Sequence, residues 1–236
     1  MKSMVRSAIA AAALIGCGGP PIPPTPVEVA PPPRPVVRAP ALKTTQELGT
    51  IDESATKKIF QKLGSKFQGC QSAALGRVEY LSGEVKFFLR IGENGRVKYG
   101  YLERSTLGDR AAEQCLLDAA IGAAWPAPDG GEAEVRYDGL GFDPASSVRM
   151  PTEWPSDRVA GVVGKNSDAF SSCLRDTAGA KFTVTAYIAP GGEVQSVGVA
   201  TSTKEGATKI ECIVKVAQSI KMPNPGSWAA KVAFQL

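Results

Sequence analysis

The pattern of apolar positions along the chain predicts the same run of elements twice. In the first run, apolar residues recur every three or four positions over 59–74, as on one face of a helix, and then alternate over 85–91, as in a strand. Asn94-Gly95 predicts a tight hairpin, because both residues tolerate a positive φ. After the return strand, Asp109 can cap a second helix, which Pro126 ends before a closing strand.

The second run begins near Ser156, with a first helix that Gly161 and Gly164 weaken. The same periods place its five elements over 159–173, 182–188, 194–201, 207–220 and 231–236. Each run therefore predicts the order α-β-β-α-β.

The two runs also match residue by residue. Shifted by 97 positions, residues of the first run fall on identical residues of the second, and they are Ile91, Gly95, Val97, Ser105, Thr106, Cys115, Pro126, Pro128 and Val135. Around the first helix the shift is 103, because Phe67-x-x-Cys70 repeats as Phe170-x-x-Cys173. Since these residues set the shape of the backbone, the match predicts a duplicated domain.

The predicted fold class is α+β, with two tandem small domains in which two helices cover one face of a three-stranded sheet. The expected divisions are a signal peptide at 1–16, a lipidated cysteine and linker at 17–48, a first domain at 49–145 and a second at 156–236. Residues 78–81 are expected to add a short strand. The first domain's second helix is expected to bury a face made of Ala112, Cys115, Leu116, Ala119 and Ala123.

The N-terminus has the features of a targeting segment. Lys2 and Arg6 precede an apolar stretch over 8–15, which is far shorter than the ~20 residues of a membrane-spanning helix. Leu14-Ile15-Gly16-Cys17 then resembles the lipobox of bacterial lipoproteins, in which the cysteine is lipidated and becomes the first mature residue. An ordinary secretory signal is the alternative. Gly18, where an inner-membrane lipoprotein commonly has aspartate, implies a lipid anchor in the outer membrane.

Proline makes up about half of the residues over 20–40, so this segment cannot build a core. We expect a semi-rigid spacer, with a docking site for a proline-reading domain as the alternative.

Four cysteines remain once Cys17 is assigned to the lipid: Cys70, Cys115, Cys173 and Cys212. An exported protein meets an oxidising compartment, and four cysteines allow three disulfide connectivities. The duplication selects Cys70–Cys115 and Cys173–Cys212, because a duplicated domain carries its own bridge. A zinc site of all four is the competing interpretation, although such sites commonly use close cysteine pairs.

Composition excludes several function classes. The formal net charge of +4 is too small to indicate nucleic acid binding. The chain has no histidine, which excludes Ser-His-Asp and Cys-His catalysis and histidine-ligated metal sites. We therefore expect no catalytic residue, metal, cofactor or small-molecule substrate. Glu93, Asp109 and Glu113 lie close in sequence and leave a carboxylate-based, glycan-acting enzyme as the enzymatic alternative.

The residues of the first run resemble the AgmX/PglI C-terminal domain, which occurs in proteins linked to gliding motility and is related to the C-terminal domain of TonB-type proteins. The resemblance is carried by Ile91, Gly95, Val97, Ser105, Thr106, Leu107, Asp109, Cys115, Trp125, Pro126 and Pro128. The second run departs from it, with Met222 in place of Trp125 and Lys204-Glu205-Gly206 in place of Leu-Gly-Asp. The resemblance implies a periplasmic binding or adaptor module and carries no catalytic residue across.

The sequence as a whole predicts a lipid-anchored adaptor that binds another envelope protein, in a motility or trafficking complex. A structural or peptidoglycan-associated lipoprotein is the alternative. We expect a partner strand to pair with the unpaired edge of the closing strand over 134–140, unless the segment over 143–155 covers that edge. The candidate binding residues are Arg136, Tyr137, Leu140, Tyr99, Tyr101 and Trp125.

Overall fold

The structure is a computed structural model that describes residues 48–177 and 179–236, and every helix, strand and contact given for it lies within those residues. They belong to one compact unit of mixed α/β architecture, which spans residues 45–236 and holds seven helices and seven strands. Cys17, the expected signal peptide and the linker through residue 47 lie outside the described residues.

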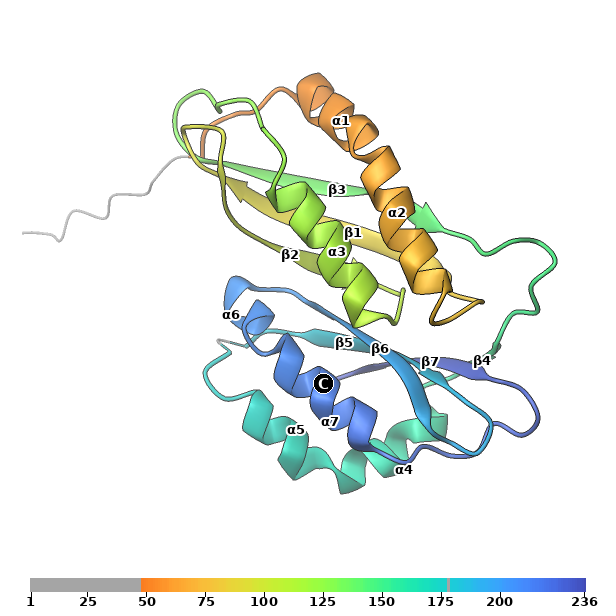
Figure 1. Cartoon of the computed structure of the whole chain (residues 1–236). Helices are drawn as coiled ribbons and strands as arrows, with labels where there is room; N and C mark the ends of the chain where they lie inside the picture. The colour runs from red at the N-terminus through yellow and green to blue at the C-terminus, as the bar shows by residue number, and fades with distance from the viewer. Residues whose placement is uncertain (1–47, 178) are drawn as a thin grey trace, which may run out of the picture. The chain divides into compact units, whose positions relative to one another are not determined.

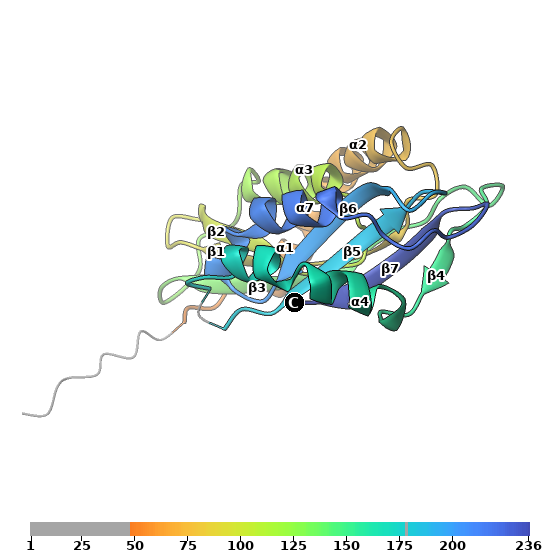
Figure 2. The same cartoon turned by 90° about the horizontal axis from the view of Figure 1, so that it is seen from below.

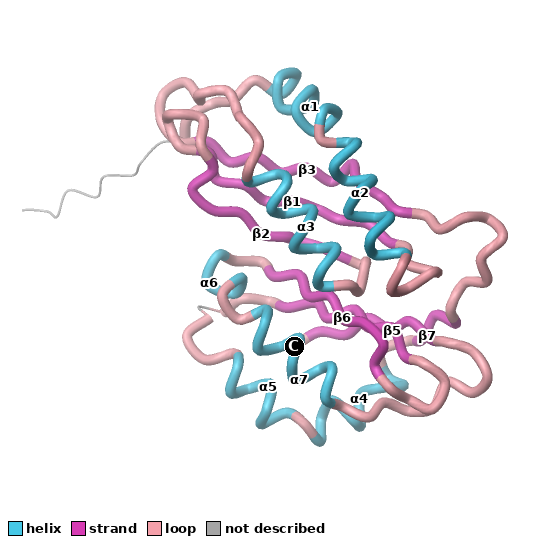
Figure 3. The backbone as a smooth tube through the Cα atoms, in the orientation of Figure 1, coloured by secondary structure: helices cyan, strands magenta, loops and turns pink. Residues whose placement is uncertain are grey.

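The first half of the described chain places three helices on one face of an antiparallel sheet with strand order β2-β1-β3 (Figures 1 and 3). Its elements are α1 (Glu53–Lys62), α2 (Gly64–Leu75), β1 (Gly83–Ile91), β2 (Val97–Ser105), α3 (Arg110–Ile121) and β3 (Ala133–Phe142). Phe87, Leu89 and Val135 point toward the helices and form the core with Phe67 and Leu116.

The second half repeats this order, with one short strand added before it and one short helix added before its last helix. Its elements are β4 (Thr152–Trp154), α4 (Asp157–Lys165), α5 (Ser167–Cys173), β5 (Phe182–Ile188), β6 (Val194–Thr201), α6 (Lys204–Ala207), α7 (Ile210–Ser219) and β7 (Ala230–Gln235). The strand order is β4-β7-β5-β6. The expectation of three strands is therefore wrong for this half, because β4 adds a fourth strand that runs parallel to β7 (Figure 2).

The first expected helix of each half is broken into two at matching positions. Leu63 ends α1 and precedes α2, and Asn166, which lies 103 positions later, does the same for α4 and α5. The break changes the direction of the chain while Phe67 and Phe170 stay buried at the equivalent turn.

Gly95 and Gly192 lie at equivalent positions of the two hairpin turns, 97 residues apart, and have the same role in each. Gly95 has a φ of 73° and Gly192 a φ of 88°, both in the left-handed region that favours glycine. A Cβ on Gly95 would clash with the Trp125 carbonyl oxygen, and one on Gly192 with that of Met222, itself 97 positions after Trp125. Each glycine thus lets its turn lie against the chain that follows the last helix.

Both expected disulfides are confirmed. Cys70 of α2 is bonded to Cys115 of α3, and Cys173 of α5 to Cys212 of α7, with Cα–Cα distances of 5.8 and 5.7 Å. In each half the bridge joins a buried cysteine on the first helix pair to an exposed cysteine on the later helix.

Two local expectations differ from the structure. Residues 78–81 form turns instead of a strand, and they bury Val78, Tyr80 and Leu81. The buried face of α3 is also rotated from the expected one: Ala112 and Leu116 are buried as expected, but Cys115 is exposed. The remaining buried positions of α3 are Glu113, Leu117 and Ala120.

The two halves pack against each other within the compact unit. The edge strands β2 and β6 lie side by side, and α3 also contacts β6 (Figure 1). Tyr187 of β5 is fully buried and joins the core cluster of the first half. Its hydroxyl donates to the Ser82 carbonyl at 3.2 Å and accepts from the Ser82 N–H at 3.1 Å. The second sheet is thus covered by its own helices on one face and by the first half on the other.

Candidate protein-docking edge

The outer edge of β3 begins with one hydrogen bond and then stays unpaired among the described residues. The Gly49 N–H donates to the Glu132 carbonyl at 2.8 Å, so Glu132 points its carbonyl away from β1. Backbone direction alternates along a strand, so the N–H and C=O of Glu134 and Arg136 point the same way. The register with β1 is regular up to Tyr137, which supports this assignment. An unpaired row of this kind can receive another strand.

The equivalent edge of the second half is occupied. The Thr152 N–H donates to the Ala229 carbonyl at 2.9 Å, which matches the Gly49–Glu132 bond at shifts of 103 and 97. There the chain continues along β7 as β4, whereas in the first half it turns away after Thr50, which bridges to Asp129. Within the segment over 143–155, Thr152–Trp154 therefore pairs with β7, and no described residue of the segment pairs with the outer edge of β3.

Arg136 lies on this edge as expected. It is exposed, its guanidinium carbon sits 4.7 Å from the centroid of the Phe88 ring, and it pairs with Glu134 at 2.9 Å and Glu103 at 3.5 Å. Burial opposes ionisation of Glu103, but Lys86 and Arg136 hold the pKa of Glu103 below its usual value. Charged side chains of both signs thus surround a buried aromatic ring on the sheet face opposite the helices.

The other expected binding residues divide into edge and core. Tyr137 is half-buried and points toward the helices, where its ring stacks on Phe60 with centroids 3.8 Å apart, and Leu140 is half-buried against the same core. Trp125 is buried and donates from its indole N–H to the Ala120 carbonyl at 3.0 Å, so it does not line the edge.

Tyr101 is buried on the opposite face of the sheet, where it stacks on Phe88 and donates to the Ser202 carbonyl at 3.2 Å. Tyr99 is half-buried beneath the Lys204 ammonium, 4.7 Å from the ring centroid. Both tyrosines therefore contact the second half of the chain and lie on β2, away from β3.

The three carboxylates considered for catalysis are not gathered into one site. Glu93 is exposed in the hairpin turn. Asp109 caps α3 by accepting from the Ala112 N–H at 2.8 Å and pairs with Arg77 at 2.5 Å. Burial opposes ionisation of Asp109, but hydrogen bonds from Arg77, Ala112 and Ser196 keep its pKa below the usual value. Asp109 is thus engaged as a capping and pairing group.

Sequence reasoning missed that Glu113 connects the two halves. Its carboxylate accepts from the Ser105 hydroxyl at 2.6 Å and from the Val199 N–H of β6 at 2.9 Å. Burial raises the pKa of Glu113 to about 7, against the lowering effect of those two hydrogen bonds. Its position four residues before Leu117 and seven before Ala120 places a carboxylate within the apolar stripe of α3, which was the available signal.

Within 48–177 and 179–236, no three of the potential histidine, cysteine, aspartate or glutamate ligands come together as a metal site would require. The helices of this part of the chain are also too short or too polar to cross a bilayer. No family model, curated protein or solved structure matches the chain.

Proposed function

We propose that the protein is a lipid-anchored adaptor of the bacterial outer membrane, whose folded part binds an extended segment of another envelope protein along β3. We also propose that the two halves are tandem domains of the AgmX/PglI type, because the first run of the sequence resembles that family. This assignment agrees with the repeated order of elements and with one disulfide in each half.

The observation that carries the proposal is the difference between two equivalent edges. The edge of β7 holds the extended segment Thr152–Trp154, while the edge of β3 has the same first hydrogen bond and then no partner in the described chain. In the second half, a short strand thus already pairs with the edge that corresponds to the outer edge of β3. Strand addition draws affinity from main-chain hydrogen bonds and specificity from alternate side chains.

The chemistry of the edge limits the partner. A segment that pairs with Glu134 and Arg136 has to supply its own backbone N–H groups, so a proline-rich segment fits poorly. Its side chains would meet alternating acidic and basic groups, because Glu134, Arg136 and Asp138 lie along the edge. We therefore infer a partner segment that is extended, poor in proline and polar on the face beside Arg136.

Substituting Arg136 tests the docking edge. Arg136→Pro removes an N–H that points away from β1, so it should abolish partner binding while costing the β1–β3 ladder little. Arg136→Ala is the matched control, because it removes the same ion pairs and keeps the N–H. The measurement is photo-crosslinking in intact envelopes from a benzoylphenylalanine at position 138, followed by affinity measurement with the purified partner.

Loss of binding in Arg136→Pro together with binding retained in Arg136→Ala, at similar melting temperatures, supports β3 as the docking edge. Equal binding by both variants would refute it. Sedimentation with peptidoglycan sacculi, without a crosslinked protein, would instead favour the peptidoglycan-associated alternative, and turnover of glycan substrates would favour the enzymatic one.

The anchor is tested separately at Cys17. Mass spectrometry of the mature N-terminus should show a diacylglyceryl-modified cysteine, since lipoprotein processing leaves that residue first. Cys17→Ser should release the protein from the membrane fraction or leave its signal peptide uncleaved. An unmodified N-terminus at another residue would end the lipoprotein hypothesis and leave the docking edge untouched.

A further inference from the structure

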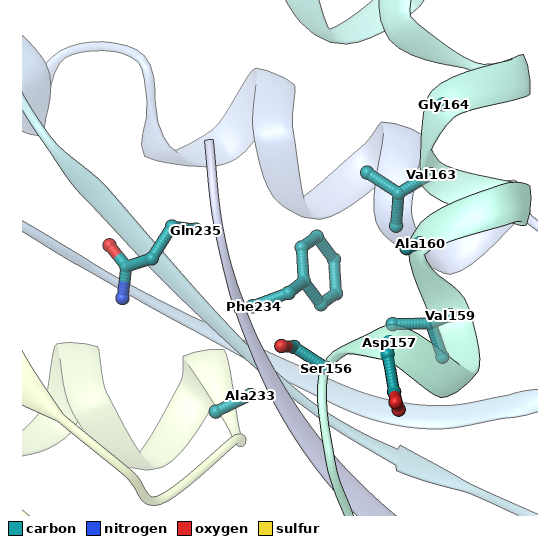
Figure 4. Close-up of a pocket in the computed structure, with 9 residues that line it drawn as sticks. All are labelled: Ser156, Asp157, Val159, Ala160, Val163, Gly164, Ala233, Phe234 and Gln235. Carbon is teal, nitrogen blue, oxygen red and sulfur yellow. The ribbon is translucent and has the colours of Figure 1, made fainter.

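A hollow of about 800 Å³ lies between α4 and the C-terminal end of β7. Figure 4 shows Val159, Ala160 and Val163 of α4 on one side and the ring of Phe234 on the other. Asp157 is the one ionisable side chain among the lining residues, and it is exposed at the rim. The lining of the hollow is therefore mainly apolar, with Ser156 and Gln235 as its uncharged polar side chains.

The same place in the first half is filled by an aromatic ring. Shifts of 103 and 97 pair Val163 with Phe60 and Phe234 with Tyr137. Phe60 and Tyr137 stack with an interplanar angle of 9°, and Phe60 is 3% exposed. The second half has Val163 where the first half has Phe60, and Met222 where Trp125 packs on Phe60, so this place in the second half has fewer rings than in the first.

The backbone beside the hollow is also unpaired on its outer side. The Leu236 N–H donates to Phe182 of β5, so by alternation the backbone groups of Ala233 and Gln235 point away from β5. On that side β4 ends at Trp154, and Pro155 has no N–H with which to continue the ladder. In the chain as described, the β7 edge beyond Val232 therefore has no strand opposite it.

We propose that this hollow binds an aromatic side chain carried by an extended segment of a protein partner. Two features select this occupant over others. The segment would continue the line of β4 along Ala233–Gln235, and its ring would take the place that Phe60 fills in the first half. The unpaired backbone supplies hydrogen bonds that a lipid acyl chain cannot use, which favours a peptide. The site is separate from the β3 edge and does not depend on it.

The test uses the whole chain with Cys17→Ser and N-acetyl-phenylalanine amide as the probe, followed by amide chemical shifts in ¹⁵N-labelled protein. We expect shifts at Ala160, Val163 and Gln235 with a dissociation constant of about 1 mM, as befits a ligand of this size. N-acetyl-glycine amide, which has the backbone groups without the ring, should bind at least tenfold more weakly.

Two substitutions place a larger side chain in the hollow, and a third, outside the hollow, is the matched control. Val163→Phe supplies the ring found in the first half, and Ala160→Trp fills the mouth from an exposed position; each should weaken probe binding at least tenfold. Lys165→Phe adds the same ring to an exposed position of α4 outside the hollow and should leave binding unchanged.

Three outcomes would overturn the proposal. The first is an absence of chemical shift changes at the lining residues. The second is unchanged probe binding by Val163→Phe and Ala160→Trp when both variants are folded. The third is stronger binding of octanoate than of the phenylalanine amide, which would make the hollow a lipid site. Since the β3 test concerns a different strand, either proposal can fail while the other stands.

Discussion

Glu113 is a buried carboxylate at the contact between the two halves, and its position restricts which residue can stand opposite it on β6. A Cβ at position 198 would clash with the Glu113 carboxylate, so glycine is required there for α3 to approach β6. The charged form of Glu113 has two hydrogen-bond donors but no bonded cation, since Arg110 acts only at longer range. Burial therefore dominates and favours the protonated form.

The pKa of Glu113 predicts a fall in stability as the pH rises. The folded state raises this pKa from 4.5 to about 7, so the folded state binds the proton more tightly than the unfolded state. The stability that Glu113 contributes is fully present below pH 4.5, is lost as the pH rises from 4.5 through about 7, and then levels off, with a total loss of about 3 kcal/mol. Glu113→Gln should flatten this decline, because glutamine mimics the protonated acid and can still bond Ser105 and Val199. Urea unfolding at pH 5, 6, 7 and 8 measures it.

Asp109 and Glu103 should not add to the decline in stability between pH 4.5 and 7. Asp109 and Glu103 have lowered pKa values, so the stability they contribute is present above their unfolded pKa values and is lost only as the pH falls through the folded ones. Glu84→Gln, at an exposed site with a weak ion pair, is the matched control and should keep the wild-type decline. Parallel pH profiles for the wild type and Glu113→Gln would contradict the prediction.

At the scale of elements, local pattern was sufficient for most strands and helices and insufficient wherever a distant segment decided the outcome. The return strand, the closing strands and both disulfides followed from alternation and from the repeat. Residues 78–81 have the apolar spacing of a strand, but Tyr80 reaches Gln195 and Arg77 reaches Asp109, so the segment turns to make these contacts. β4 was missed because three residues between prolines form a strand only when β7 lies beside them.

The two disulfides predict how much the free energy of unfolding falls when either bridge is removed. Each bridge closes a loop of roughly forty residues, with sequence separations of 45 and 39, and should stabilise the protein by about 4 kcal/mol through the unfolded chain. Cys70→Ser with Cys115→Ser, and Cys173→Ser with Cys212→Ser, should therefore lower the free energy of unfolding by similar amounts. Urea titration without reductant measures both. Wild-type protein treated with reductant should match the variant that lacks both bridges, and a loss below about 1 kcal/mol in either pair would contradict the chain-entropy account.

At the scale of the whole molecule, two equivalent sheets are used differently. The face of the second sheet opposite its helices is buried under the first half, where Thr185 is 1% and Tyr187 0% exposed. The corresponding face of the first sheet carries the partly exposed ion pairs Lys86–Glu103 and Arg136–Glu134. The repeat alone predicts two similar domains but not which face of one covers the other. That arrangement depends on contacts of Glu113, Asp109 and Tyr187 with residues 86 to 105 positions away.

The buried contact predicts that the halves stay together when the chain between them is cut. Ser146 and Ser147 are exposed, and each disulfide lies within one half, so a protease site inserted there should be cleaved without loss of association. Size-exclusion chromatography of the cleaved protein at about 1 μM should give one peak, because hydrogen-bonded and apolar groups buried between the halves persist after cleavage. Tyr187→Ala removes the bonds to Ser82 and opens a cavity, so its cleaved form should separate, while Arg136→Ala on the free edge should not. Separation of the wild-type halves would show that the two act as independent modules.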